Sequence, residues 1–529
     1  MYLSGTGFTA PCTLSFGSVG ATCLVSSATE IISVVPEGAA TGQLTLTTGG
    51  DTYTSAKPLN VPSPAVTISP ASGPPGTAVT VSGSGFGSDE ALNLYAGTTD
   101  QALVVSSSAG SFSYPGFVIP ASAQPGSYWV SAVGSSSGLA AQAAYDVQVN
   151  WPEFGFSTAN DESNPYEDTI SPGNVGSLSL DWTYTTGAGI YGPPAVVNGV
   201  LYSGSDDGNV YALNATTGAQ LWSFAAGAQI ESSPAVVNGV VYIGDNAGTV
   251  YAINASTGTE LWSYNTGGQV YSSPAVANGI VYVGSVNDTL YALNATTAAL
   301  LWSYTTGNWI YSSPTVANGV VYIGSYDYNV YALNATTGAV LWSFNTGDFG
   351  GYIDSAPAVA NGVVYVANQA GDVDALNAAT GTELWNYSAL TTFESSPAVA
   401  DGLVYVGAAG SVGIEHALSA ATGQQVWSFQ TGASVNAASS VANGVIFVPS
   451  EDDTLYALNA ATGTELWSYT TGGYLTSQPV IVNGMVYQTG FDGTIYAFSL
   501  PGAADAAARG QARPAVRALR PSRSLKVTR

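Results

Sequence analysis

Eight side chains that could bind a ligand recur at one position of a repeated sequence. Each stands seven residues before an Asn-Gly or Asp-Gly pair, and the eight are Tyr191, Glu231, Tyr271, Tyr311, Asp354, Glu394, Asn436 and Thr476. Oxygen ligands of these kinds suit Ca²⁺, and the same groups could hold a sugar or a peptide. We therefore predict a ligand-binding set in which Glu231, Asp354 and Glu394 are the candidate metal ligands. The alternative is a solvated polar surface that binds nothing.

The repeat that carries these residues is about 40 residues long. Residues 211–227 read YALNATTGAQLWSFAAG, and close copies begin at Tyr251, Tyr291, Tyr331 and Tyr456. Every copy ends in a tryptophan strand, and the tryptophans are Trp182, Trp222, Trp262, Trp302, Trp342, Trp385, Trp427 and Trp467. A period of this length, built from short β-type runs, indicates a propeller or an array of repeats.

One period contains four expected strands, over residues 230–237, 240–244, 249–254 and 260–264. Alternating β-branched and aromatic residues joined by two-residue turns favour hairpins over helix. Four strands make one blade, and the eight Asn-Gly or Asp-Gly turns indicate eight blades. The last copy lacks its fourth strand, whereas Trp182 lies in a strand that has no blade before it. We predict an all-β chain whose eight-bladed propeller is closed by this shared blade, with the eight candidate residues around one mouth of its channel.

The repeated tryptophans are interpreted as structural residues. A large indole at the same point of every blade is suited to act as a wedge between neighbouring blades. The repeated Asn-Gly and Asn-Ala-Thr-Thr-Gly segments have the composition of turns. None of these residues is a predicted site.

The charge distribution excludes some functions. Of the eight Lys and Arg residues, only Lys57 precedes Arg509, whereas all 34 acidic residues lie before it. Nucleic-acid binding and binding to anionic membrane surfaces need several basic side chains, whereas residues 1–508 hold one, so neither is an expected partner. No segment has the length and apolarity of a membrane span. Cys12 and Cys23 flank an expected hairpin and are either disulfide-bonded or two free thiols.

The first 149 residues resemble the IPT/TIG immunoglobulin-like family. Residues 5–8 (GTGF), 16–17 and 35–38 (VPEG) match its pattern, but the opening strand of the family is missing before residue 1. That opening does occur at residues 68–88, ISPASGPPGTAVTVSGSGFGS. The resemblance implies a partial domain over residues 1–61 and a β-sandwich over residues 62–149, both of them spacer or adhesion modules.

Residues 150–500 resemble the pyrroloquinoline-quinone-type (PQQ) propeller family through the motifs A-x-T-G-x-x-L-W and S-P-A-V-x-N-G-V-V-Y. Residues 150–187 resemble the lead-in strand of that propeller. The dehydrogenases of the family hold a tricarboxylated quinone with Arg or Lys, a Ca²⁺ ion and a catalytic Asp, and many have a disulfide between adjacent cysteines. Residues 150–500 contain no Lys, Arg or Cys, so the resemblance predicts the fold but disfavours PQQ as a cofactor.

Together these features favour a non-catalytic, exported or cell-surface propeller on immunoglobulin-like spacers. We expect a monomer that binds a protein or glycan partner, with Ca²⁺ as the one candidate cofactor. One alternative is a PQQ- and calcium-dependent dehydrogenase. A second is an envelope-assembly scaffold that resembles the propeller lipoprotein of outer-membrane barrel assembly. Residues 501–529 hold seven of the eight Lys and Arg residues and are expected to form a disordered basic tail.

Overall fold

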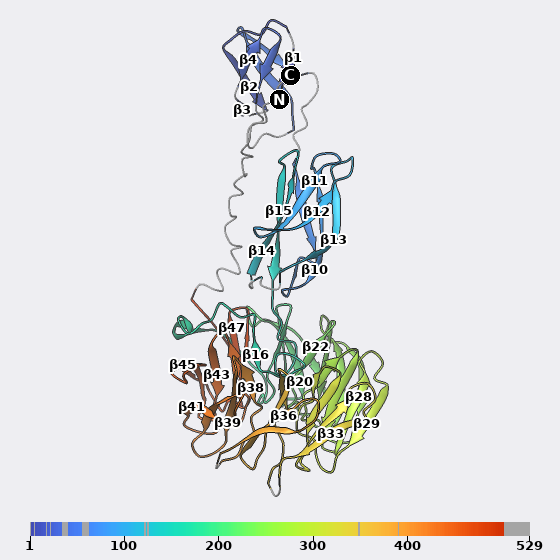
Figure 1. Cartoon of the computed structure of the whole chain (residues 1–529), viewed down its shortest axis with the longest axis vertical. Helices are drawn as coiled ribbons and strands as arrows, with labels where there is room; N and C mark the ends of the chain where they lie inside the picture. Colours follow the sequence, from blue (N-terminus) through green and yellow to red (C-terminus); the bar gives the residue numbers. More distant parts are fainter. Residues whose placement is uncertain are drawn as a thin grey trace.

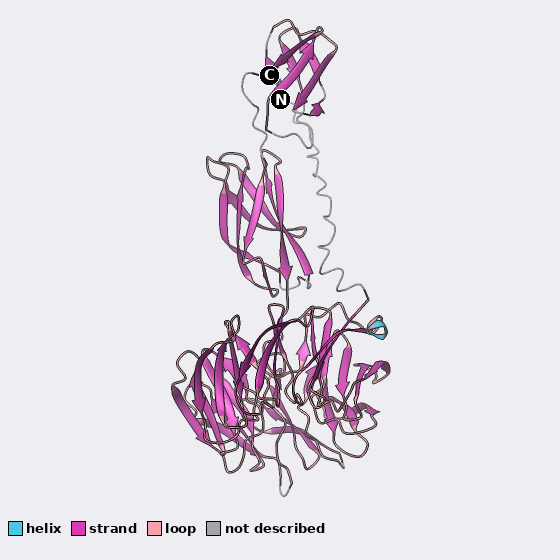
Figure 2. Ribbon diagram, turned by 180° about the vertical axis from the view of Figure 1, so that it is seen from behind, coloured by secondary structure: helices cyan, strands magenta, loops and turns pink. Residues whose placement is uncertain are grey.

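The structure is a computed structural model that describes residues 2–501, apart from residues 5, 17, 22, 34–40, 56–62, 121–122, 124–125, 348–349 and 390. The family match at residues 35–38, Lys57 and all of the predicted basic tail except Pro501 lie outside the described residues. Apart from the one-turn 3-10 helix η1 (Val175–Ser177), the described elements are all strands. The predicted all-β class is confirmed (Figures 1 and 2).

The N-terminal part consists of two small sheets. Strands β1 (Tyr2–Ser4), β5 (Glu30–Ile32) and β4 (Leu24–Ser27) form one; β3 (Val19–Ala21), β2 (Cys12–Phe16), β6 (Leu44–Thr48) and β7 (Asp51–Thr54) form the other. Leu14, Phe16 and Ile31 are buried between them. Cys12 and Cys23 form a disulfide that continues the register of the β2–β3 hairpin, in which Leu14 pairs with Ala21.

The second part is a β-sandwich. Strands β13 (Phe112–Val118), β10 (Ala78–Ser84) and β8 (Ala65–Ser69) form one sheet. The other contains β12 (Thr99–Val105), β11 (Ala91–Ala96), β14 (Gly126–Gly134), β15 (Ala140–Val147) and β9 (Ser72–Gly73). Alternate residues such as Leu92, Leu94 and Val130 face the core and are fully buried, as expected for two sheets packed face to face.

Eight four-stranded antiparallel units follow, and they form the predicted propeller. The innermost strands are β18 (Ala195–Val197), β22 (Ala235–Val237), β26 (Ala275–Ala277), β30 (Thr315–Ala317), β34 (Ala358–Ala360), β38 (Ala398–Ala400), β42 (Ser440–Ala442) and β46 (Val480–Val482). The second strands are β19 (Val200–Gly204), β23 (Val240–Gly244), β27 (Ile280–Ser285), β31 (Val320–Gly324), β35 (Val363–Ala367), β39 (Leu403–Ala408), β43 (Val445–Pro449) and β47 (Met485–Thr489).

The third strands are β20 (Asn209–Asn214), β24 (Thr249–Asn254), β28 (Thr289–Asn294), β32 (Asn329–Asn334), β36 (Asp372–Asn377), β40 (Ile414–Ser419), β44 (Thr454–Asn459) and β48 (Thr494–Ser499). The outer strands are β21 (Gln220–Ala225), β25 (Glu260–Asn265), β29 (Leu300–Thr305), β33 (Val340–Asn345), β37 (Glu383–Ser388), β41 (Gln425–Gln430), β45 (Glu465–Thr470) and β17 (Ser179–Thr185). Because β17 pairs with β48 in the order β17-β48-β47-β46, the first strand of the propeller completes its last blade. The predicted shared closing blade is confirmed.

The expected first strand of each blade is too long. In the second blade it was predicted over residues 230–237, but the ladder covers only Ala235–Val237. Pro234 has no N–H to donate, and Ser233 instead donates its N–H to the Ser273 hydroxyl of the next blade. The segment before each innermost strand is therefore tied to a neighbouring blade.

The tryptophans are wedges between blades. Each indole Nε1 donates to a backbone carbonyl of the following blade over 2.9–3.2 Å, from Trp182 to Ala215, Trp222 to Ala255, Trp262 to Ala295, Trp302 to Ala335, Trp342 to Ala378, Trp385 to Ala420, Trp427 to Ala460 and Trp467 to Leu178. The last of these bonds ties the seventh blade to the segment that leads into β17. The apolar core is correspondingly divided into clusters between adjacent sheets, such as the one that joins Ala212 to Val241 and Ile243.

Candidate binding mouth

The eight candidate residues lie at the end of the propeller away from the immunoglobulin-like part. The Asn-Gly turns mark the other end, where Asn483 Oδ1 accepts from Val149 N–H at 2.9 Å and Asn150 Oδ1 accepts from Asn198 N–H at 3.0 Å. Figure 1 shows the β-sandwich above that face of the propeller. All eight candidate side chains are partly buried, each just before an innermost strand. We call this end the mouth.

The segment that follows the β-sandwich lies against the innermost strands. Its backbone carbonyls accept one N–H from each of six blades, over 2.6–3.0 Å: Trp151 from Val196, Pro152 from Val236, Thr158 from Val316, Ala159 from Val359, Asp161 from Val399 and Glu162 from Val441. The Glu153 carboxylate accepts from Val276 N–H, and Asn164 donates to the Ile481 carbonyl. All eight innermost strands are thus bonded to residues 151–164, which we call the plug.

The plug shows that the prediction of a lead-in strand was wrong for most of its length. The lead-in strand predicted over residues 150–187 is confined to β17, while residues 163–164 form only the short strand β16 (Ser163–Asn164) against β42. An innermost strand has one edge without a neighbour in its own sheet, and its N–H groups need acceptors when buried. The plug supplies those acceptors, so the chain folds back across the centre of the propeller instead of entering it as a strand.

The structure brings most of the eight candidate residues together. Tyr271 and Tyr311 stack with ring centroids 5.0 Å apart. Burial, and next the charge of Glu231, raises the pKa of Tyr191 and of Tyr271, the residues on either side of Glu231. Burial and then the charge of Asp354 likewise raise the pKa of Glu394.

Asn436 and Thr476 are the less connected members of the set. Asn436 Nδ2 donates to Glu451 at 3.0 Å. The hydroxyl of Thr476 is buried and has no hydrogen-bond partner among the described residues.

A second set of mouth residues escaped the sequence analysis. It stands fifteen residues after the first set, in the hairpin between the second and third strands, and consists of Asp206, Asn246, Val286, Tyr326, Gln369, Ala409, Glu451 and Phe491. The backbone N–H of each member donates to the backbone carbonyl of the residue two positions before the first-set residue of its blade, over 2.8–3.0 Å. Like the first set, this position varies within a nearly uniform repeat, and that signal could have found it.

Side chains of the two sets pair within blades and between neighbouring blades. Asn246 Nδ2 donates to Glu231 Oε1 at 2.6 Å, and both Tyr326 and Gln369 donate to Asp354. The rings of Tyr311 and Tyr326 stack 4.8 Å apart. The mouth is therefore lined by two linked layers of side chains.

The mouth contains crowded carboxylates. Burial, followed by the charges of Glu231 and Asp207, raises the pKa of Asp206 to about 6. Burial also raises the pKa of Glu231, and that of Asp354 although two donors oppose the shift. No Lys or Arg occurs in residues 150–500. A bound cation would therefore relieve both repulsion and desolvation at these groups.

Aromatic rings fill the part of the mouth between Glu231 and Asp354. The Tyr326 ring lies 4.9 Å from that of Tyr352, which is 5.1 Å from Tyr328. Trp309 packs 6.1 Å from Tyr311 and keeps 48% of its surface exposed. We call Tyr271, Trp309, Tyr311, Tyr326 and Tyr352 the aromatic platform.

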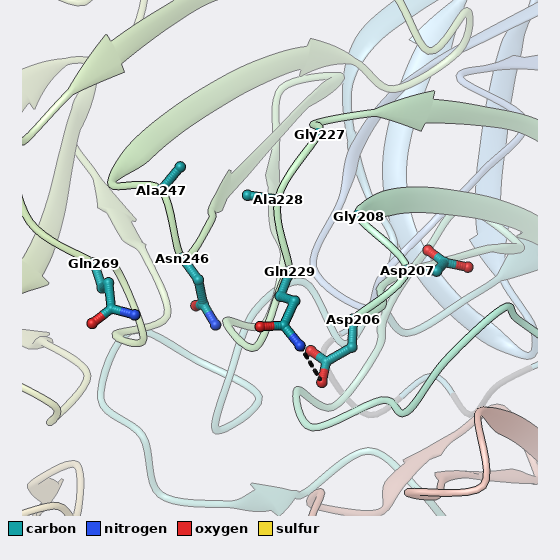
Figure 3. A pocket seen from close by; sticks show the side chains of 9 residues that line it. All are labelled: Asp206, Asp207, Gly208, Gly227, Ala228, Gln229, Asn246, Ala247 and Gln269. Carbon is teal, nitrogen blue, oxygen red and sulfur yellow. Dashed lines mark hydrogen bonds between the residues drawn. The ribbon is translucent and has the colours of Figure 1, made fainter.

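A shallow pocket of about 450 Å³ opens beside this platform, across the first three blades. It is lined by Asp206, Asp207, Gly208, Gly227, Ala228, Gln229, Asn246, Ala247 and Gln269. Figure 3 shows Gln229 reaching toward Asp206, to which its amide donates at 3.5 Å. The pocket walls offer amides and carboxylates, which suit a polar ligand.

The three candidate metal ligands do not form one site. Glu231 lies with Asp206, whereas Asp354 lies with Glu394. Among the described residues, no group of three or more His, Cys, Asp or Glu side chains is placed to hold a metal ion. Ca²⁺ binding at the mouth remains a prediction, and it would need ligands that the present arrangement keeps apart.

Family models match both parts of the chain. The model of PQQ-type repeats described as outer membrane protein assembly factor BamB matches residues 173–272, 246–351, 346–440 and 412–524, which together exceed half of the chain. The chain belongs to this PQQ-type propeller family. An IPT/TIG domain model matches residues 65–146. The resemblance to the PQQ-type family is thereby confirmed, and so is the resemblance to the IPT/TIG family over residues 65–146, whereas the partial domain over residues 1–61 stays a prediction. No match was found among curated proteins.

Solved structures agree on the fold of this PQQ-type propeller. A quinohemoprotein alcohol dehydrogenase from Pseudomonas putida HK5 superposes with a TM-score of 0.60 at 18% identity, covering 69% of this chain and 81% of that one. The Comamonas testosteroni quinohemoprotein alcohol dehydrogenase gives 0.61 at 18% identity, with the same coverages. BamB from Moraxella catarrhalis gives 0.54 at 19% identity, covering 61% of this chain and 99% of that one. Identities this low show the fold alone.

The residues of this PQQ-type propeller do not fit a quinone with several carboxylates. Such a cofactor would need positive charge, and residues 150–500 supply no Lys or Arg and a single His, His416. His416 is buried, and burial lowers its pKa, which favours the neutral ring. At the mouth a carboxylated ligand would meet Asp206, Glu231, Asp354 and Glu394, which would repel it.

Proposed function

We propose that this protein is a non-catalytic binding propeller, exported or displayed at the cell surface, which recognises a protein or glycan partner at its mouth. The observation that carries the proposal is the convergence of both variable positions of the repeat on one end of the propeller. In a repeat protein the conserved positions maintain packing between units, so positions that vary together on one surface are the natural place for recognition.

The chemistry of the mouth supports binding. The aromatic platform offers large rigid faces, and the pocket beside it offers amides and carboxylates. Tyr and Trp are enriched where proteins bind partners because they supply apolar area together with a polar group. Aromatic faces also stack on sugars, so both partner classes remain within the proposal.

The position of the immunoglobulin-like part supports display of the mouth at a surface. The immunoglobulin-like part attaches at the face of the Asn-Gly turns, so the mouth points away from it (Figure 1). The Cys12–Cys23 disulfide is compatible with an oxidising compartment. Among the described residues no helix has the length and apolarity to cross a bilayer.

A second candidate is an envelope-assembly scaffold. The description of the matching family model and the Moraxella catarrhalis BamB structure favour it. It shares a non-catalytic propeller with the first candidate but requires protein partners of the cell envelope. The nature of the partner therefore separates the two.

Two charge-matched variants of the full chain test the proposal. The mouth variant carries Glu231→Gln and Glu394→Gln. The rim control carries Glu260→Gln and Glu383→Gln, which remove two exposed carboxylates from outer strands. We expect wild type and rim control to bind the same glycans or purified envelope proteins on arrays, and the mouth variant to bind them at least tenfold more weakly. Equal binding by both variants would place recognition elsewhere.

Calorimetry tests the alternatives. Wild-type protein titrated with Ca²⁺ and then with pyrroloquinoline quinone should give no quinone heat. Tight quinone binding would overturn the non-catalytic proposal and favour the dehydrogenase.

A further inference from the structure

The aromatic platform has the geometry of a cation-binding surface. Five rings lie within 6.2 Å centroid distances of their neighbours, and Trp309 keeps about half of its surface open to solvent. The faces of Trp and Tyr rings attract ammonium and guanidinium groups within about 6 Å of the ring centre. The exposed indole is therefore a contact point for a basic side chain.

Carboxylates flank the platform on both sides. Glu231 and Asp206 lie beyond Tyr271, and Asp354 lies against Tyr326 with Glu394 and Glu451 behind it. Among the described residues, Glu231 and Asp354 accept hydrogen bonds from amides and a tyrosine hydroxyl, and none of these donors carries a positive charge. Rings and carboxylates together select Arg and Lys side chains over phosphate or carboxylate ligands.

The chain itself carries one segment of that chemistry. Residues 509–529 contain six Arg and one Lys and no acidic residue, while the 508 residues before them contain only Lys57 as a cation. This tail is thus the one segment of the sequence rich in the positive charge that would complement the carboxylates of the mouth.

The tail is long enough to reach. Strand β48 runs from the mouth to the opposite face. Its six residues rise by roughly 3.3 Å each, so the tail that follows it starts about 20 Å from the mouth. The tail must then pass outward over the edge of the last blade and inward again across the mouth face, which adds about 15–20 Å for each blade width at roughly 4.8 Å per strand. The 28 residues after Pro501 span up to about 90 Å when extended, so the C-terminal part of the tail can reach the platform whereas its first residues cannot.

We infer that the C-terminal part of residues 509–529 docks on the mouth of its own propeller, with its Arg and Lys side chains on the aromatic platform and against Glu231, Asp354 and Glu394. This inference rests on the proposed function, because it names the ligand chemistry of the same mouth. A tethered segment has an effective concentration of the order of millimolar, so even a weak intramolecular contact is populated. The tail would then compete with any basic partner.

Trypsin gives a direct test, since it cleaves after Arg and Lys and nearly all of its sites lie in the tail. The rate of tail cleavage is measured by mass spectrometry on full-length wild type, mouth variant and rim control at low salt. Cleavage tracks the population of the undocked tail when docking is fast. We expect wild type and rim control to be cleaved about tenfold more slowly than the mouth variant, and 1 M NaCl to remove the difference.

The remaining outcomes each decide against the inference. Equal cleavage rates in all three proteins would overturn it, and so would slower cleavage in the mouth variant. Protection that disappears on dilution would assign the contact to a second copy of the chain. A free peptide of residues 509–529, cleaved in the same buffers, corrects for the effect of salt on trypsin. Failure here leaves the proposed function standing, because that is judged by partner binding of the same variants.

Discussion

Gly338 lies directly over Trp302 of the preceding blade: a Cβ atom at Gly338 would come within 2.7 Å of the indole ring. Gly338 also has a φ of +70°, which other residues rarely adopt. The same turn holds glycine in most blades, but in the third blade the position is Ala298, with a φ of +60°. One blade of the propeller therefore keeps a side chain where packing and backbone both favour glycine.

Exchange at these two positions should have opposite effects. Ala298→Gly is expected to stabilise the protein by about 1 kcal/mol, and Gly338→Ala to destabilise it by more than that, because the left-handed conformation costs an L-residue about 1–2 kcal/mol. Urea unfolding followed by tyrosine and tryptophan fluorescence would measure both. Equal effects of the two exchanges would show that the turn adjusts freely.

Truncation of a wedge tryptophan should be costly. Trp302→Ala removes a half-buried indole, its hydrogen bond to Ala335 and its contact with Tyr282, and should lower the free energy of unfolding by about 3–5 kcal/mol. Trp309→Ala is the matched control, since Trp309 is exposed at the mouth and its indole N–H donates no hydrogen bond to the next blade among the residues that the structure describes. A similar loss for both variants would contradict the wedge role.

The stability of the protein should fall as the pH rises. Burial raises the pKa of Glu153 in the plug and of Glu415 between blades to about 8, from an ordinary value of 4.5. Between these pH values the folded state retains protons that the unfolded state has released. The contribution of these two groups to stability is therefore full below about pH 4.5 and decreases steadily as the pH rises to about 8. Each such group contributes a slope of about 1.4 kcal/mol per pH unit at most.

Glu415→Gln isolates one of these groups. It keeps an oxygen to accept from Ser439 but cannot ionise, so it should be nearly neutral near pH 4.5 and more stable than wild type at pH 8. Urea midpoints at several pH values would show this, with exposed Glu383→Gln as the control. An unchanged pH slope in Glu415→Gln would mean that water reaches the carboxylate.

Replacing Glu231, Asp354 and Glu394 together with Gln, Asn and Gln should abolish any calorimetric Ca²⁺ signal of the wild type. The reason is that carboxylates supply most of the affinity of an oxygen site for Ca²⁺. A Ca²⁺ heat that survives in the triple variant would place the ion outside the mouth.

The sequence by itself determined the repeat, the number of blades, the shared closing blade and the end of the propeller at which Glu231 and Asp354 lie. These follow from local patterns, since turn residues and strand alternation report on neighbours that are close in the chain. It did not reveal the second layer at Asn246 and Tyr326, although the spacing of fifteen residues recurs in every blade.

Only the tertiary structure decided the course of the plug. Residues 151–164 have no period, and their partners, such as Val196 and Val441, are far away in the chain. Six of the eight innermost strands are held by backbone carbonyls of the plug, which every residue type possesses, so no side-chain pattern records those contacts. The division of the three carboxylates between two groups was likewise set by the angular positions of their blades, because closing eight sheets into a ring fixes which side chains can meet.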